Sequence, residues 1–243
     1  MLVLNQDFFN PRNIIQFIEA STNVLTYNNR EVVAQKEYWL YYYIKEDVTS
    51  NLYSLQGRDI NLDIFGFSSI KRTTRHVIEA YLDMFNLCSD PEYIEVMKYC
   101  SHKESRVTGN YWKYRHNNQY TIQSKARIAK EIHGADFQWL FNISKESNSY
   151  VHPNVFVDVI GQDEVARKEA ILRELLQVNF NMLTGAYSLL MRKFNNGQQP
   201  CLNCMGCSTR NCLSCYKGAA SNFQQLLNWQ LFSEVAPQQP FFM

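Results

Sequence analysis

Ile70–Leu87, which reads IKRTTRHVIEAYLDMFNL, decides the predicted fold of this 243-residue chain. Its apolar residues recur every three or four positions and therefore share one face of a helix. They are Val77, Ile78, Tyr81, Leu82 and Phe85. Ser68 or Ser69 precedes the segment and can cap the free N–H groups of its first turn. We expect this segment to be the central helix of the fold.

Similar periodicity on both sides of this segment predicts further helices. Their ranges are Pro11–Tyr27, Glu31–Gln56, Asp90–Cys100, Thr121–His133, Ala135–Lys145, Gln162–Phe194 and Ser221–Glu234. Gly57–Phe67 carries two glycines and two aspartates and is predicted to be a loop. The predicted fold class is all-α, a multi-helix bundle over residues 11–196. A cysteine-rich metal knuckle at 197–220 and a closing helix with a tail at 221–243 follow it.

Composition narrows the class of protein. Hydrophobic residues make up 46% and charged residues 19% of the chain, which is ordinary for a globular protein. The net charge of +1 gives no global attraction to nucleic acid or to a membrane. No apolar run approaches the length of roughly 18 residues that a membrane span needs, and the first residues do not resemble a signal peptide. We therefore expect a cytoplasmic protein without a membrane partner.

The predicted second helix contains an aromatic run, Tyr38–Ile44. Because the run is apolar or aromatic nearly all round, we expect it to be sandwiched between other helices. Stacking of these rings on nucleobases is the alternative. Against that alternative, no basic residue interrupts the run before Lys45.

Between Ser101 and Lys130, the lysines and arginines outnumber a single acid, Glu104, so a negatively charged partner would bind there. The helical period is lost over Ser101–Tyr120, which indicates a long connection. This connection alternates aromatic and basic side chains: Tyr111, Trp112, Lys113, Tyr114 and Arg115. Such a pattern can hold single-stranded RNA by stacking and phosphate contact. A solvated loop anchored by its aromatics is the alternative.

Five of the seven cysteines fall within fifteen residues, and this clustering favours a metal site. They are Cys201, Cys204, Cys207, Cys212 and Cys215. Tetrahedral zinc needs four ligands, so either Cys207 or Cys201 is left out, and both sets stay open. A closed thiolate site indicates structural zinc, while C-x2-C-x2-C is also a ligand spacing of iron–sulfur clusters.

A second group of polar residues suggests a site in the bundle. Arg75 and Glu79 are four residues apart and share a face of the central helix. His152 precedes Pro153, which disfavours helical backbone at the histidine and directs its ring away from the preceding helix. A histidine can exchange protons near neutral pH. A histidine that locks a helix end to Arg75 and Glu79 is the structural alternative.

The run R-x3-E-A-Y-L at Arg75–Leu82, followed by S-N-S-Y-V-H-P at Ser147–Pro153, resembles a bacterial helical family grouped with the HEPN superfamily. The resemblance implies a helical bundle, often dimeric, and in many members a metal-independent endoribonuclease of toxin–antitoxin or antiviral defence systems. Matched to the R-N-x3-H motif, the histidine falls on His152 and the asparagine on Asn148, while Ser147 stands where the arginine belongs.

The departure at Ser147 leaves two functions open. In an enzyme, His152 would act as general acid or base, and Lys145 or Arg75 would supply the missing cation. The resemblance thus predicts a HEPN-like protein of bacterial defence or stress biology that cleaves or binds RNA. The alternative is a non-enzymatic interaction or assembly module, stabilised by structural zinc and joined to a protein partner or a second copy.

Overall fold

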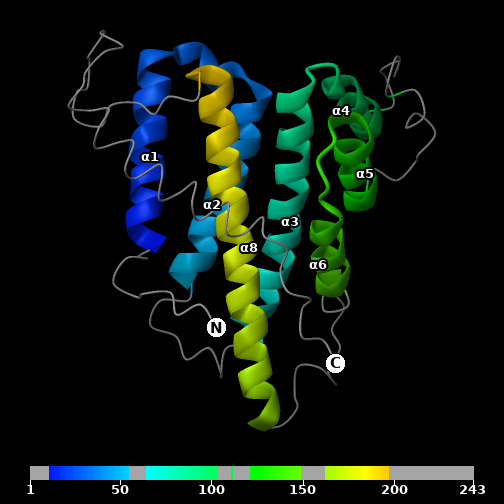
Figure 1. Cartoon of the computed structure of the whole chain (residues 1–243). Helices are drawn as coiled ribbons and strands as arrows, with labels where there is room; N and C mark the ends of the chain where they lie inside the picture. The colour runs from blue at the N-terminus through cyan, green and yellow to red at the C-terminus, as the bar shows by residue number, and fades with distance from the viewer. Residues whose placement is uncertain (1–10, 55–63, 103–110, 112–120, 149–161, 197–243) are drawn as a thin grey trace. The chain divides into compact units, whose positions relative to one another are not determined.

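The computed structural model describes residues 11–54, 64–102, 111, 121–148 and 162–196. These residues form α-helices and one 3₁₀-helix, with no strand among them, so the all-α prediction is confirmed for this part of the chain (Figure 1). No helix within these ranges combines the length and the apolar character that a membrane crossing requires. The predicted knuckle and the closing helix lie outside the described residues.

The chain divides into two compact units. The first unit comprises Met1–Tyr38 and Leu190–Met243, and the second comprises Trp39–Leu189. The domain boundaries predicted from the sequence fall at or beyond the end of the described residues and stay predictions.

In the first unit, α1 (Pro11–Asn28) packs against the 3₁₀-helix η1 (Arg30–Ala34). Its buried residues recur at helical spacing and give α1 an apolar face. They are Ile15, Ile18, Val24 and Leu25, and Val32 is the buried residue of η1. Lys193 also donates a hydrogen bond to the buried Glu37 carboxylate within this unit.

The helix predicted from Glu31 starts later than expected. Residues Arg30–Ala34 form η1, and Gln35 is extended (φ −83°, ψ 144°). Helix α2 (Lys36–Ser54) begins only after this break. The N–H of Gln35 bonds to the Val32 carbonyl, which closes the 3₁₀ turn and ends it. The prediction of one continuous helix from Glu31 was therefore wrong at its N-terminal end.

Helix α3 (Ile64–Ser89) is central to the second unit and packs against α4 (Tyr93–His102), α5 (Ile122–His133) and α6 (Gln138–Asn148) (Figure 1). The sequence predicted a loop up to Phe67, and this was wrong from Ile64 onward because the helix begins there. The central position of the segment is confirmed. Its buried residues include Ile70, Val77, Ile78 and Leu82, at the spacing of one helix face.

Helix α6 runs antiparallel to α3. The Phe137 ring, just before α6, lies 5.8 Å from the Tyr81 ring and 4.8 Å from the Phe85 ring. Further along α6, Ile143 packs against a cluster that contains Ile70, near the start of α3. Successive contacts of α6 therefore move backward along α3.

The end of α5 was predicted at Gly134, and the structure confirms it, whereas α6 begins at Gln138 and not at the predicted Ala135. Gly134 has φ 73°, a left-handed conformation that glycine adopts without strain. Its N–H and that of Ala135 bond to the carbonyls of Lys130 and Ala129, which satisfies the end of α5. Asp136 then accepts the N–H of Gln138 at the start of α6. Two hydrogen bonds lower the pKa of the Asp136 carboxyl: the one from Lys130, which has the larger effect, and the one from the Gln138 N–H.

Helix α8 (Gln162–Phe194) has the bounds that the sequence predicted. In the second unit it is parallel to α3: Asn179 donates to the Thr74 hydroxyl at 3.0 Å, and Gly185 lies against Tyr81. A Cβ at Gly185 would lie 2.8 Å from Tyr81 Cε2 and 2.9 Å from its hydroxyl oxygen, closer than van der Waals contact allows. Any side chain at position 185 would therefore have to displace the Tyr81 ring.

The Gly185→Ala substitution tests this close approach. The added methyl group must displace the Tyr81 ring, so we expect a net loss of about 1–2 kcal/mol in the free energy of unfolding, as in other overpacked cores. In a Tyr81→Leu background the same substitution should become neutral or stabilising, because alanine favours helix over glycine by about 1 kcal/mol. Urea unfolding of the four proteins measures both effects. An equal loss in both backgrounds would contradict the contact.

Candidate functional site

Glu79, one of the predicted site residues, is paired with a lysine that the sequence did not single out. Lys125 of α5 donates to the Glu79 carboxylate at 3.0 Å and to the Asp83 carboxylate at 2.6 Å. Glu79 and Asp83 are one turn apart on α3, so both carboxylates face the same point on α5. Asn86, almost one turn further, donates to the Lys125 carbonyl at 3.1 Å. These contacts fix the register of α5 on α3.

The exposed fraction of the three charged side chains decreases from Glu79 to Asp83 to Lys125. The side chain of Lys125 is 2% exposed, that of Asp83 10% and that of Glu79 36%. Tyr93 of α4 donates its hydroxyl to the second oxygen of Asp83 at 2.8 Å. A buried ammonium and a buried carboxylate are tolerated only when each has such partners. We call Glu79, Asp83, Lys125 and Tyr93 the lysine cluster.

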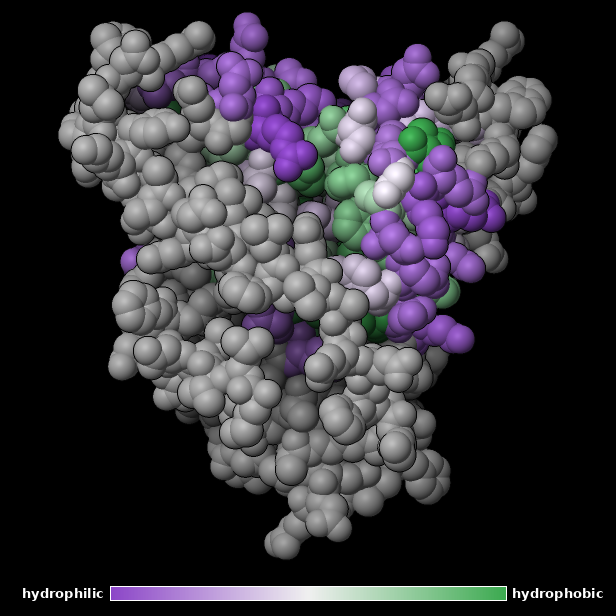
Figure 2. Space-filling view, viewed as in Figure 1, coloured by the Kyte–Doolittle hydropathy of each residue, from purple (hydrophilic) through white to green (hydrophobic). Residues whose placement is uncertain are grey.

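The position of Lys125 corrects the expectation that all the basic residues of Ser101–Lys130 face a negatively charged partner. Its neighbours at helical spacing, Ile122, Ala126, Ile128 and Ala129, are buried. Arg127 and Lys130 are exposed on the opposite side of α5. Figure 2 shows hydrophilic side chains gathered over the part of the molecule that contains α4 and α5. Lys125 therefore belongs to the core, while its two basic neighbours in the sequence belong to the surface.

A second polar group lies beside the lysine cluster. Tyr111 donates its hydroxyl to the Asp90 carboxylate at 2.9 Å, and the same hydroxyl is 3.4 Å from His133 Nε2. The other Asp90 oxygen accepts the N–H of Glu92 at the start of α4. Burial lowers the pKa of His133, and the nearby Asp90 carboxylate offsets part of this effect. The imidazole is thus held toward its neutral form.

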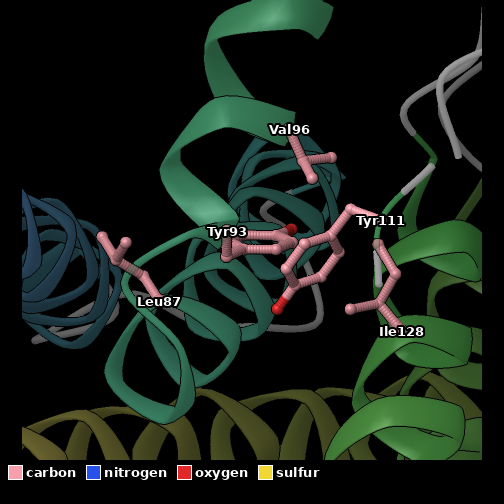
Figure 3. Close-up of a cluster of buried hydrophobic side chains, with 5 residues drawn as sticks. All are labelled: Leu87, Tyr93, Val96, Tyr111 and Ile128. Carbon is pink, nitrogen blue, oxygen red and sulfur yellow. The ribbon is translucent and has the colours of Figure 1, made fainter. Parts of the chain in front are cut away.

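Tyr93 and Tyr111 connect the two polar groups through an apolar cluster. Their rings pack edge to face, with centroids 5.9 Å apart (Figure 3). Both rings are buried, together with Leu87, Val96 and Ile128. Tyr111 is 1% exposed, so its ring cannot stack on a base in this arrangement and instead anchors the chain. The other members of the predicted RNA-binding stretch, Trp112, Lys113, Tyr114 and Arg115, lie outside the described residues.

Of the other predicted catalytic residues, Arg75 lies close to Glu79 along α3, whereas Asn148 does not lie beside it. Arg75 lies one turn before Glu79 on α3 and is half-buried. Asn148 is the last residue of α6, whose antiparallel course leads away from Glu79 toward the start of α3. Ile70, near which α6 passes, lies about 13 Å along α3 from Glu79, at a rise of about 1.5 Å per residue. His152 lies outside the described residues.

The predicted metal ligands Cys201, Cys204, Cys207, Cys212 and Cys215 also lie outside the described residues. Within the described ranges, no group of three or more His, Cys, Asp or Glu side chains could hold a metal ion. The lysine cluster has two carboxylates, but a lysine ammonium occupies the position between them. Its chemistry is therefore that of an internal ion pair.

The chain matches no protein-family model, no curated protein and no solved structure. The resemblance to the HEPN superfamily therefore stays a hypothesis that rests on two short motifs. The contacts among α3, α4 and α5 are the structural observations that bear on function.

The lowered pKa of His133 predicts how stability depends on pH. The unfolded chain binds a proton more readily than the folded chain, so the stabilisation is complete above the ordinary histidine pKa and is lost as the pH falls toward the folded value. The free energy of unfolding should therefore decrease from about pH 7.5 to about pH 5, the range in which histidine titrates. Urea titrations of wild type and His133→Gln across this range measure the decrease.

The His133→Gln variant should show a smaller decrease than the wild type. Lys130→Gln is the matched control, because it changes the charge of the same turn and leaves the His133 imidazole in place. It should shift the free energy of unfolding and leave the slope against pH unchanged. Identical slopes for wild type and His133→Gln would contradict the assignment.

Proposed function

We propose that this chain is a HEPN-like helical protein that works as a non-enzymatic interaction module in bacterial defence or stress biology. The observation that carries the proposal is the lysine cluster. Glu79, a predicted site residue on α3, accepts a hydrogen bond from the buried Lys125, which also pairs with Asp83. A general base must reach the proton that it removes. A carboxylate that is already paired with a buried lysine is better suited to holding helices together than to removing a proton.

The separation of Asn148 from Glu79 in the described residues also supports a binding role. The direction of α6 leads Asn148 away from Glu79, and the motif that resembles HEPN enzymes has Ser147 in place of arginine. Without that arginine, the charge that develops on a phosphate would need a cation from elsewhere. A protein partner or a second copy of the chain is the binding partner that this proposal implies.

Endoribonuclease activity is the second candidate, and one sequence observation favours it. His152 follows Asn148 at the spacing of the HEPN motif and stands before a proline. The basic residues Lys113 and Arg115 of the predicted RNA-binding stretch would then bind the RNA backbone. This candidate requires His152 for proton transfer.

An RNA cleavage assay separates the two candidates. If the protein is an interaction module, purified wild type and His152→Ala should both leave a single-stranded RNA intact. If it is a nuclease, the wild type cleaves and His152→Ala loses roughly 10²–10⁴-fold of the rate, the usual contribution of a proton-transfer group. The second result would overturn the interaction proposal.

The RNA assay needs a control for binding without cleavage. Charge reversal of Lys113 and Arg115 should weaken any binding to the same RNA and flatten its salt dependence, because phosphate contacts release counterions. If the RNA stays intact, comparing the affinities of wild type and the charge-reversal variant shows whether the RNA was bound through Lys113 and Arg115.

Zinc on the cysteine cluster completes the proposal. A site closed by four thiolates has no open position for water or substrate, so its role is to hold the fold. Protein purified under reducing conditions should contain about one equivalent of zinc per chain, and modification of the thiolates should release the zinc and lower stability. Metal analysis that finds no zinc would contradict the site. A stoichiometric content of iron and sulfide would instead identify an iron–sulfur cluster.

A further inference from the structure

The outer face of α2 carries large aromatic side chains. Trp39 is 44% exposed and Tyr43 is 59% exposed. Glu46 and Ser50, also exposed, continue the same stripe at helical spacing. The sequence predicted that this aromatic run would be sandwiched between helices. That prediction was wrong for Trp39 and Tyr43, because only one side of the helix is buried, through Tyr41, Ile44 and Val48.

The rings on this face are inclined to one another. The Tyr42 ring lies 5.8 Å from that of Trp39 at 70° and 6.5 Å from that of Tyr43 at 67°. Lys45 Nζ lies 5.0 Å from the centroid of the Tyr42 ring. Edge-to-face contacts of this kind hold aromatic rings in fixed orientations. The result is a row of inclined, partly exposed aromatic surfaces along one side of the helix.

The charges near these rings favour a protein partner over nucleic acid. From Trp39 to Ser50 the helix has one base, Lys45, and two acids, Glu46 and Asp47. Lys45 pairs with Glu46 at 3.0 Å, and the second acid leaves this stretch with a net negative charge, which repels phosphates. Single-stranded nucleic acid requires a positive surface beside the aromatic rings. The Glu46 side chain is 52% exposed and can accept a further hydrogen bond from a cation.

We propose that this face of α2, formed by Trp39, Tyr42, Tyr43 and Glu46, binds a proline-rich segment of a protein partner that carries an adjacent arginine. The proposal rests on the interaction function proposed above and names the chemistry of the partner. Prolines in the polyproline II conformation pack on aromatic side chains, and the conformation exists before binding, so little entropy is lost.

The hydrogen-bonding groups of the two sides are complementary. A proline-rich chain has carbonyl acceptors and few N–H donors, because proline lacks the N–H and polyproline II has no internal hydrogen bonds. The indole of Trp39 and the phenol of Tyr43 are donors. A neighbouring arginine on the partner can bind the Glu46 carboxylate. The acidic end of the stripe therefore sets the direction in which the peptide lies.

Fluorescence anisotropy with three labelled probes tests the proposal on the full chain. The probes are an oligoproline with an arginine at one end, the same oligoproline with a glutamate in place of the arginine, and an oligouridine of similar length. The arginine oligoproline should bind most tightly. Trp39→Ala and Tyr43→Ala should each weaken it by about tenfold or more, as expected for aromatic anchors at an interface. Glu46→Lys should remove the preference for arginine over glutamate.

Tyr27→Ala is the matched control, because Tyr27 is also exposed, at 67%, but belongs to the first unit. It should leave the affinity unchanged, and circular dichroism should show the same helix content in all variants. Failure of the arginine oligoproline to bind, or tighter binding of oligouridine through Trp39, would overturn the inference. RNA cleavage that depends on His152 would instead overturn the proposed function and can be observed whatever the peptide result.

Discussion

The pairing of the Lys125 ammonium with the carboxylates of Asp83 and Glu79 is the constraint on which the centre of the second unit depends. A lysine that is 2% exposed can stay charged only if its partners are close and in turn satisfied. Asp83 meets this condition because Tyr93 bonds to its other oxygen at 2.8 Å. The pairing therefore requires α3, α4 and α5 to take their positions together. It also explains why the group acts as part of the core, since the lysine occupies the place that a metal or a substrate cation would need.

Two tyrosines, Tyr111 and Tyr81, extend the order from this pairing to the neighbouring helices. Tyr111 packs on Tyr93 and bonds to Asp90, so residue 111 is held at the end of α3 although it is distant in sequence. Tyr81 touches Phe137 before α6 and approaches Gly185 of α8. In the interior, the charged groups of the lysine cluster are thereby paired with one another. If the protein acts by binding, its partner has to be recognised on the surface, and the exposed rings of α2 offer such a place.

Much of the helical layout could be predicted from the sequence, and most of the site could not. The bounds of α8 follow from its long periodic run and its stop at Asn195, and the end of α5 follows from Gly134. The break at Gln35 was missed because the residues of the 3₁₀ turn before it, Arg30–Ala34, are equally compatible with a continuous α-helix. The burial of Lys125 was missed because a lysine is ordinarily placed at the surface. The one available signal was Glu79 and Asp83, two acids one turn apart on a helix that the sequence had marked as central. His152 and the cysteine cluster lie outside the described residues, and their roles stay predictions.

A double-mutant cycle on Lys125 and Asp83 tests most directly whether the lysine cluster holds the second unit together. Lys125→Met leaves two carboxylates without their cation and should lower the free energy of unfolding by about 3–5 kcal/mol, the usual cost of breaking a buried pair. In Lys125→Met/Asp83→Asn the buried charge of Asp83 is also removed, and the new amide oxygen can still accept the hydrogen bond from the Tyr93 hydroxyl. The double variant should therefore be more stable than Lys125→Met alone. Lys130→Met is the control, because its pair with Asp136 is exposed and is worth about 0–1 kcal/mol. If Lys125→Met costs no more than Lys130→Met, and the Asp83 substitution recovers nothing, the cluster does not have the structural role assigned to it.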